Sequence, residues 1–261
     1  MKGLTTIASA AALAMSLAAS VTPAHAAVFA HFTPDTNARD FRWINSGPGD
    51  NGTGGHFFSI KTQNSTVAQG VATHFSFVDP ALSVLAFLPA TFTVDATVAA
   101  GNPASVNGAG VWAQTSLNGS FSFIYSGATI NNFMGSGIDL IHGSNLLSGV
   151  FSNAWIQGSG GSGSFNLAHG NGGVATYSSD YESFSHVAPG TEEFAFNLLS
   201  TTPAFVAKPG KALKGFRANG GGNFSFEAVP EPASWGLMIV GFAGLGGLIR
   251  SRRERGRTMA A

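Results

Sequence analysis

Six acidic side chains are the residues of this sequence whose chemistry best suits catalysis. They are Asp95, Asp139, Asp180, Glu182, Glu192 and Glu193. A glycoside hydrolase uses two such carboxyl groups, one as an acid and one as a base or nucleophile, at a separation of about 5 to 9 Å. Their places along the chain do not show which of them meet. Hydrolysis of a glycosidic bond is therefore kept as an alternative and is not the leading hypothesis.

The motifs of other enzyme classes are missing from the sequence. It contains no G-x-S-x-G, H-E-x-x-H or Walker motif, and it has no cysteine. Residues 158–163 read GSGGSG and match G-x-G-x-x-G, but a dinucleotide site needs a helix after this loop, and a strand-like SFNL follows. We therefore predict a β-turn there, and we predict a protein that is not an enzyme and has no cofactor.

Side chains that bind metals are scattered. The six histidines between the two ends of the chain are His31, His56, His74, His142, His169 and His186. None of them pairs at the spacing of a metal site. Residues 50–54 and 179–182, with Asp139, offer oxygen atoms that suit calcium, but neither stretch matches an EF-hand or RTX repeat. Ordinary Asx-turns are the favoured interpretation, with no metal bound, and calcium is the alternative.

A basic residue recurs at every third position near the end of the body. The four residues are Lys208, Lys211, Lys214 and Arg217. Pro209, Gly210 and Gly215 disfavour a regular helix in this stretch. It is either a basic loop that binds an acidic polysaccharide or an ordinary solvated surface loop, and we favour the surface loop.

Five aromatic side chains are candidates for stacking on sugar rings. They are Trp43, Trp112, Trp155, Tyr177 and Tyr181. Aromatic side chains usually pack in a core or on a sheet face, and we expect this of most of them. An exposed row of aromatics would favour a carbohydrate-active protein, whereas a buried set would favour a non-catalytic one.

Short runs in which phenylalanine alternates with other residues must form the elements that position these side chains. Residues 121–125 read FSFIY, 74–78 read HFSFV and 193–198 read EFAFNL. This alternation places the phenylalanines on one face of a strand. Further strands are predicted at residues 28–32, 41–44, 56–62, 92–98, 111–115, 150–156, 164–169, 174–177 and 224–226. We therefore predict one all-β domain over residues 27–229, with an antiparallel β-sandwich or jelly-roll-like fold.

The charge of this body excludes one class of partner. Residues 27–229 contain seven basic and eleven acidic residues, a formal net charge of −4. Proteins that bind nucleic acid usually carry a basic footprint, so nucleic acid is not an expected partner. Because the chain has no cysteine, its stability must come from packing or from bound ions.

The first 26 residues have the features of a secretory signal peptide. A basic start at Lys2 precedes an apolar run over residues 4–21, and Pro23 introduces the small-residue pair Ala24 and Ala26. Signal peptidase needs small side chains in such an extended segment. We predict cleavage by signal peptidase after Ala26 and export across the inner membrane.

The last 32 residues, 230–261, form a second special segment. Pro230, Glu231 and Pro232 cannot be helical, because each proline also restricts the residue before it. Residues 233–249 then carry no charge and would reach about 25 Å as a helix, the lower limit for spanning a membrane. Trp235 lies where an interfacial aromatic residue belongs. The arginines that follow are expected to hold this end in the cytoplasm. They are Arg250, Arg252, Arg253, Arg255 and Arg257.

This C-terminal arrangement resembles the PEP-CTERM sorting signal. The segment from Pro230 reads PEPASWGLMI, followed by Gly241-Phe242 and the basic cluster, and is most similar to the PEPxxWA variety. Gly236, Leu237 and Ala243 depart from its commoner residues. The resemblance covers about 30 residues. It implies an exosortase as partner, processing near the PEP motif, a transient inner-membrane stage, and an association with exopolysaccharide and biofilm.

The leading hypothesis from the sequence is an exported, non-catalytic cell-surface or extracellular-matrix protein. The alternative is a secreted carbohydrate-binding module or glycoside hydrolase that uses the same sorting signal. A plain C-terminal membrane anchor would also explain the apolar length and the arginines, but it does not require Pro-Glu-Pro followed by tryptophan.

Overall fold

A computed structural model describes residues 27–35, 39–188 and 190–227 of the chain. These residues build thirteen strands and four short 3₁₀ turns. The strands are β1 (Ala27–Pro34), β2 (Phe41–Asn45), β3 (Gly55–Ser59), β4 (Val71–Phe77), β5 (Leu88–Val98), β6 (Ser105–Val106), β7 (Trp112–Tyr125), β8 (Asn145–Ser159), β9 (Ser162–Leu167), β10 (Val174–Ser178), β11 (Glu193–Thr202), β12 (Phe216–Asn219) and β13 (Gly222–Phe226). The turns are η2 (Pro48–Asp50), η3 (Phe133–Gly135), η4 (His169–Asn171) and η5 (Phe184–His186).

No helix within the described ranges is long and apolar enough to span a membrane. The predicted signal peptide, 1–26, and the predicted sorting segment with its membrane helix, 230–261, lie outside the described residues. The prediction of an all-β body is confirmed, and every strand pair in it is antiparallel.

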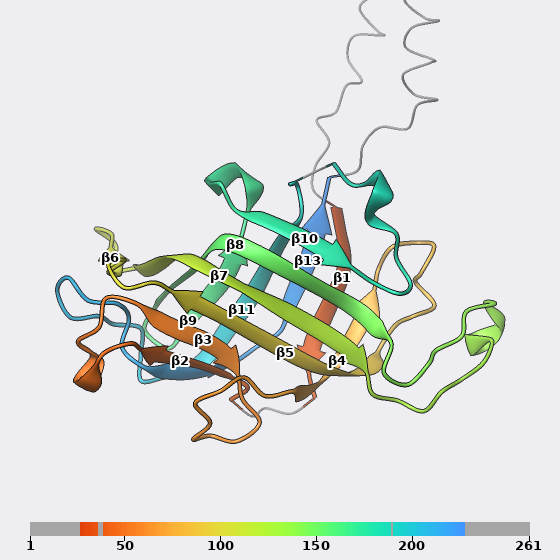
Figure 1. Ribbon diagram of the computed structural model, residues 1–261, viewed down its shortest axis with the longest axis horizontal. Coiled ribbons are helices and arrows are strands. Elements are labelled where there is room, and N and C mark those ends of the chain that lie inside the picture. Colours follow the sequence, from red (N-terminus) through yellow and green to blue (C-terminus); the bar gives the residue numbers. More distant parts are fainter. Residues whose placement is uncertain (1–26, 36–38, 189, 228–261) are drawn as a thin grey trace, which may run out of the picture.

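The strands follow one hydrogen-bonded path in the order β12-β2-β3-β5-β4-β1-β13-β11-β9-β8-β7-β6, with β10 added on β8. Additional pairings of β5 with β7 and of β11 with β12 close this path. Figure 1 shows β5, β7 and β8 across one face and β1, β11 and β13 crossing behind them. The body therefore has two layers, as a sandwich does, but they belong to one continuous sheet and not to two separate ones.

The sheet closes because two long strands are shared between neighbours. β3 pairs with residues 95–98 of β5 and β4 pairs with residues 88–92, while β7 pairs along the opposite edge of β5. In the same way, β13 and β12 pair with successive parts of β11. β1 pairs with β13, so that Ala27 lies opposite Phe226 and the first and last described strands are neighbours.

Strict alternation explains why these segments form strands. Along β5, buried residues alternate with more exposed ones from Leu88 to Val98, so every second side chain enters the core. The sequence marked most strands correctly but missed β6 and the four-residue β12. It also divided β7 in two. In the structure Ser116, with φ 62°, and shifts of register against β8 carry a single strand through that irregular stretch.

The core between the two layers is built mainly from phenylalanine. Phe92 and Phe123 are fully buried and stack with their ring centroids 4.5 Å apart. Phe32 adds contacts to Phe92 at 4.9 Å and, edge-on, to Phe196 at 5.1 Å. Burying one such side chain contributes about 1.5 to 3 kcal/mol. Because the chain has no cysteine, it has no disulfides, and packing of this kind stabilises the fold instead.

Candidate functional site

Three of the six carboxylates expected as possible catalytic pairs hold loops in place. Asp139 accepts a hydrogen bond from the Asn132 backbone N–H at 2.8 Å. Glu193 accepts one from the His169 backbone N–H at 2.9 Å. Residues 27–35, 39–188 and 190–227 contain no group of three His, Asp or Glu side chains that could hold a metal ion. Each of the two contacts fixes a loop against a segment that lies elsewhere in the chain.

Asp180 and Glu182 share a shallow hollow of about 520 Å³ formed by residues 177–185. One Asp180 oxygen accepts a hydrogen bond from the Asn145 backbone N–H at 2.8 Å. Burial raises the pKa of Glu182, and the negative charge of Asp79 raises it further. His186 opposes this shift. Two of the six carboxylates therefore line the same hollow.

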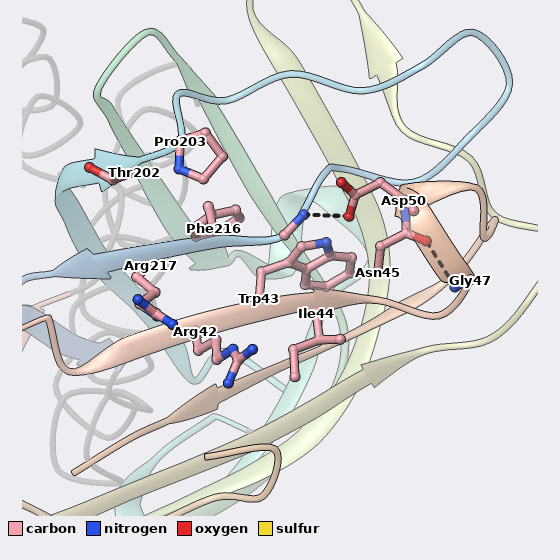
Figure 2. Close-up of a pocket in the computed structure, with 12 residues that line it drawn as sticks. Arg42, Trp43, Ile44, Asn45, Gly47, Asp50, Thr202, Pro203, Phe216 and Arg217 are labelled. Atoms are coloured by element: carbon pink, nitrogen blue, oxygen red, sulfur yellow. Dashed lines mark hydrogen bonds between the residues drawn. The ribbon is translucent and has the colours of Figure 1, made fainter. Parts of the chain in front are cut away.

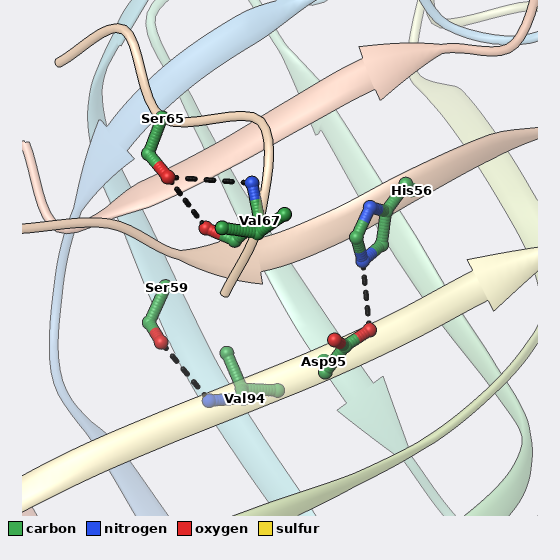
Figure 3. Close-up of polar contacts among 6 residues, drawn as sticks. All are labelled: His56, Ser59, Ser65, Val67, Val94 and Asp95. Atoms are coloured by element: carbon green, nitrogen blue, oxygen red, sulfur yellow. Dashed lines mark hydrogen bonds and ion pairs between the residues drawn. The ribbon is translucent and has the colours of Figure 1, made fainter. Parts of the chain in front are cut away.

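Figure 3 shows a serine, a histidine and an aspartate on the adjoining strands β3 and β5, of which the histidine and the aspartate are in contact. His56 Nε2 lies 2.7 Å from Asp95 Oδ1, with 28% and 49% of the two side chains exposed. Ser59 is fully buried; its hydroxyl donates to the Gln69 carbonyl at 2.7 Å and accepts from the Val94 N–H at 3.1 Å. His56 therefore does not activate Ser59 as a nucleophile. The His56–Asp95 contact joins two partly exposed side chains at the surface of the sheet.

The GSGGSG stretch forms the tight turn that we predicted. β8 ends at Ser159 and β9 begins at Ser162, with these two residues paired across the turn. Gly158 and Gly163 leave room for Phe205, because a Cβ on either would lie 2.6 Å or less from its ring. The glycines therefore serve packing and turn geometry.

The interpretation of residues 208–217 as one solvated surface loop is wrong, because the stretch runs into β12. Arg217 lies in β12, directly opposite Arg42 of β2 on one side and opposite Thr202 of β11 on the other. Lys208 Nζ donates to the Gly49 carbonyl at 2.7 Å and to Asn51 Oδ1 at 2.9 Å. These long-range contacts fix the stretch against the turn between β2 and β3.

A groove of about 500 Å³ lies over β2 and β12, with Thr202 and Pro203 beside it (Figure 2). Its framework is held by buried hydrogen bonds: Trp43 Nε1 donates to the Leu213 carbonyl at 2.9 Å, and Asn45 Nδ2 donates to the same carbonyl at 3.1 Å. Asp50 Oδ1 accepts from the Gly215 N–H at 3.0 Å. The groove is therefore a built feature of the fold.

Two arginines on adjacent strands line this groove (Figure 2). Arg42 Nη1 donates to the Ser65 carbonyl, and Arg217 Nη2 donates to Asn64 Oδ1 at 3.3 Å. Burial lowers the pKa of Arg42, and the positive charge of Arg217 lowers it further. Among the described residues the ion pairs join histidine to aspartate, and neither arginine has a carboxylate within 4.0 Å.

The five aromatic candidates separate into two groups. Trp43 and Tyr177 are buried, as expected of core residues. Trp112, Trp155 and Tyr181 are half-buried. Trp155 lines a hollow of about 370 Å³ on β8, β9, β11 and β13, beside the amides of Gln157, Asn166 and Asn223. One aromatic side chain is thus placed among hydrogen-bonding amides, while no continuous exposed row of the five is formed in the described body.

The residues predicted to act in processing lie outside the described residues. They are Ala24, Ala26, Pro230, Glu231, Pro232, Trp235, Arg250, Arg252, Arg253, Arg255 and Arg257. Their roles therefore stay predictions from the sequence. The described body ends at Glu227.

Compared with known proteins, the chain matches no curated protein and no solved structure. One family model, described as the PEP-CTERM protein-sorting motif, matches residues 228–253. That segment contains the sequence Pro-Glu-Pro, Trp235 and the first three arginines of the basic cluster. The motif implies export, an exosortase as processing partner, and a cell-surface or extracellular location. The C-terminal segment thus identifies the chain as a protein that carries the PEP-CTERM sorting motif.

Proposed function

We propose that the protein is a non-catalytic component of the cell surface or extracellular matrix, associated with exopolysaccharide and biofilm. In this proposal signal peptidase removes residues 1–26, and the sorting segment holds the chain transiently in the inner membrane. An exosortase then acts near Pro230-Glu231-Pro232. The observation that carries the proposal is the sorting motif at residues 228–253, directly after a closed all-β body that ends at Glu227.

The contacts of the body support a structural role. Asp50, Asp139, Asp180 and Glu193 each accept a hydrogen bond from a backbone N–H, so these carboxylates stabilise loops. The serine beside His56 and Asp95 is buried and donates elsewhere. A matrix protein needs a stable body and a sorting signal, and this chain combines a core of phenylalanine side chains with a sorting motif.

The alternative is a carbohydrate-binding module that uses the same sorting signal. Trp155 favours it, because a half-buried indole beside amide side chains can stack on a sugar ring while the amides bind hydroxyl groups. A glycoside hydrolase would require a productive pair of carboxyl groups, for which Asp180 and Glu182 are the candidates that share a hollow.

The intact mass of the protein recovered from the cell surface or medium tests the proposal. We expect a species that begins at Ala27 and lacks the residues after the PEP region. A strain without its exosortase should retain the full C-terminal segment in the membrane fraction. Retention of residues 235–261 in the strain that has the enzyme would contradict sorting. Release of reducing ends from a purified polysaccharide would contradict the non-catalytic role.

A further inference from the structure

The basic residues of the body gather around one part of the sheet. All seven belong to three short segments, residues 39–42, Lys61 and residues 208–217. Pairing of β2 with β12 joins the first and last of these segments, and a hydrogen bond of 2.7 Å from the Ile60 N–H to the Asp40 carbonyl brings Lys61 beside them. Of the eleven acidic residues, only Asp40, which is buried, and Asp50, which caps Gly215, belong to this region.

At the centre of this region, Arg42 and Arg217 face one another across the β2–β12 ladder. Like charges directly opposite in a sheet destabilise it. Each guanidinium carries five N–H donors, and its partners within the described residues are neutral oxygen atoms of Asn64 and Ser65. An anionic group bound between the two arginines would remove this repulsion and satisfy further donors.

The groove beside the two arginines selects among anionic ligands. Its lining includes Ile44 and Pro203, which offer apolar surface, and Thr202, which offers a hydroxyl group. A sugar ring has both kinds of surface, and the planar guanidinium matches a carboxylate with two parallel hydrogen bonds. The formal charge of −4 on the whole body disfavours the dense charge of a nucleic acid.

We propose that the groove over β2 and β12 binds a carboxylate-bearing polysaccharide, whose acidic groups are held by Arg42 and Arg217. The inference rests on the proposed function and names the glycan class that the exported protein meets. One carboxylate lies against the two guanidiniums, and the sugar ring that carries it lies along Ile44 and Pro203. The other basic residues of the region add only a diffuse attraction for the polysaccharide, which does not depend on any one of them.

Affinity electrophoresis of the protein recovered from cells tests this site. The probes are polygalacturonate, its fully methyl-esterified form, and double-stranded DNA. We expect retardation by polygalacturonate and at least tenfold weaker retardation by the ester, which has the same backbone without the charge. Equal binding of the ester, or equally strong binding of DNA, would overturn the assignment.

Two double variants locate the site. Arg42→Gln with Arg217→Gln should weaken binding of polygalacturonate at least tenfold. Lys61→Gln with Lys211→Gln removes the same charge from the same region and should weaken it by no more than about twofold. Equal losses in both would show diffuse attraction and overturn the site. If the double glutamine variant has a lowered melting temperature, Arg42→Lys with Arg217→Lys serves in its place. This variant keeps the positive charges but lacks the paired N–H donors of the guanidinium. Unchanged binding of polygalacturonate by it would also overturn the proposed site.

The two proposals fail separately. A protein with the expected processed mass that ignores polygalacturonate would contradict the acidic-glycan site and leave sorting intact. A protein that binds polygalacturonate but keeps its C-terminal segment in a strain with the exosortase would contradict sorting and leave the site intact.

Discussion

The indole N–H of Trp43 donates a buried hydrogen bond of 2.9 Å to the carbonyl of Leu213, 170 positions away in the chain. The bond ties β2 to the segment that leads into β12, and Asn45 reinforces it through the same carbonyl. Trp43 and Asn45 both line the groove that carries the two arginines. The shape of the groove therefore depends on a contact between the beginning and the end of the body.

Trp43→Phe should lower the free energy of unfolding by about 2 to 4 kcal/mol, because the fully buried side chain loses part of its volume as well as its hydrogen bond. Denaturant unfolding measures this change. Trp155→Phe is the matched control, since its indole makes no hydrogen bond within the described residues; it should change stability by less than about 0.5 kcal/mol. Equal effects of the two substitutions would show that the Trp43–Leu213 bond contributes little.

Gly119→Ala should destabilise the body by about 1 to 3 kcal/mol through overpacking. Gly119 pairs with Ala96 of β5, and a Cβ placed on it would lie 2.1 Å from the Asp95 carbonyl oxygen. Because that atom belongs to the backbone, a strand must move to make room. Gly161→Ala, in the open turn after β8, has nothing within 4 Å of its new Cβ and serves as the control. A thermal midpoint as high for Gly119→Ala as for Gly161→Ala would contradict this close approach of strands.

Asp40 should make stability depend on pH in the weakly acidic range. Burial raises the pKa of this carboxyl from 3.8 to about 6, so the folded protein binds the proton more tightly than the unfolded chain. The associated stability is present below pH 4 and is lost as the pH rises through 6, by about 1 to 3 kcal/mol. Asp40→Asn should therefore flatten the stability profile between pH 4 and 6. An unchanged slope, measured by denaturant unfolding at several pH values, would assign the effect to other groups.

Replacing Pro230 and Pro232 together by alanine should block processing, because the restriction that the two prolines impose on the backbone is lost. The intact mass should then include the residues up to Ala261. Glu231→Gln tests the acidic residue of the motif, and Glu227→Gln is its control, since it removes the same charge four residues earlier, outside the matched segment. Normal processing of the double proline variant would contradict the role of the two prolines.

The sequence predicted the strands well because phenylalanine alternates so regularly in this chain. Period-two patterns such as residues 193–198 leave one buried face, and they became β11 and its neighbours. β12 was missed because four residues between Gly215 and Gly220 are too few to show a period. Closure of the sheet was also hidden, since it depends on β5 and β11 each pairing with three neighbours.

The candidate site was only partly visible in the sequence. The basic recurrence at residues 208–217 was noticed, and an acidic polysaccharide was the less favoured interpretation of it. What the sequence cannot show is that Arg217 lies opposite Arg42, because cross-strand pairing over 175 positions has no local pattern. The dispersal of the carboxylates is likewise a property of the tertiary structure, since Asp139, Asp180 and Glu193 each accept a hydrogen bond from the backbone of a different segment.

The pairing of Ala27 with Phe226 places the first and the last strand of the body side by side. The chain enters β1 and leaves β13 at neighbouring points. The two segments that are expected to enter the membrane therefore both start from the same end of the body. Figure 1 shows these ends at the top of the molecule and β2, which carries Arg42, at the lower left. Cleavage after Ala26 and cleavage near Pro230 would each leave all thirteen described strands intact, and the strand that carries Arg42 lies away from the end of the body at which both cuts are expected.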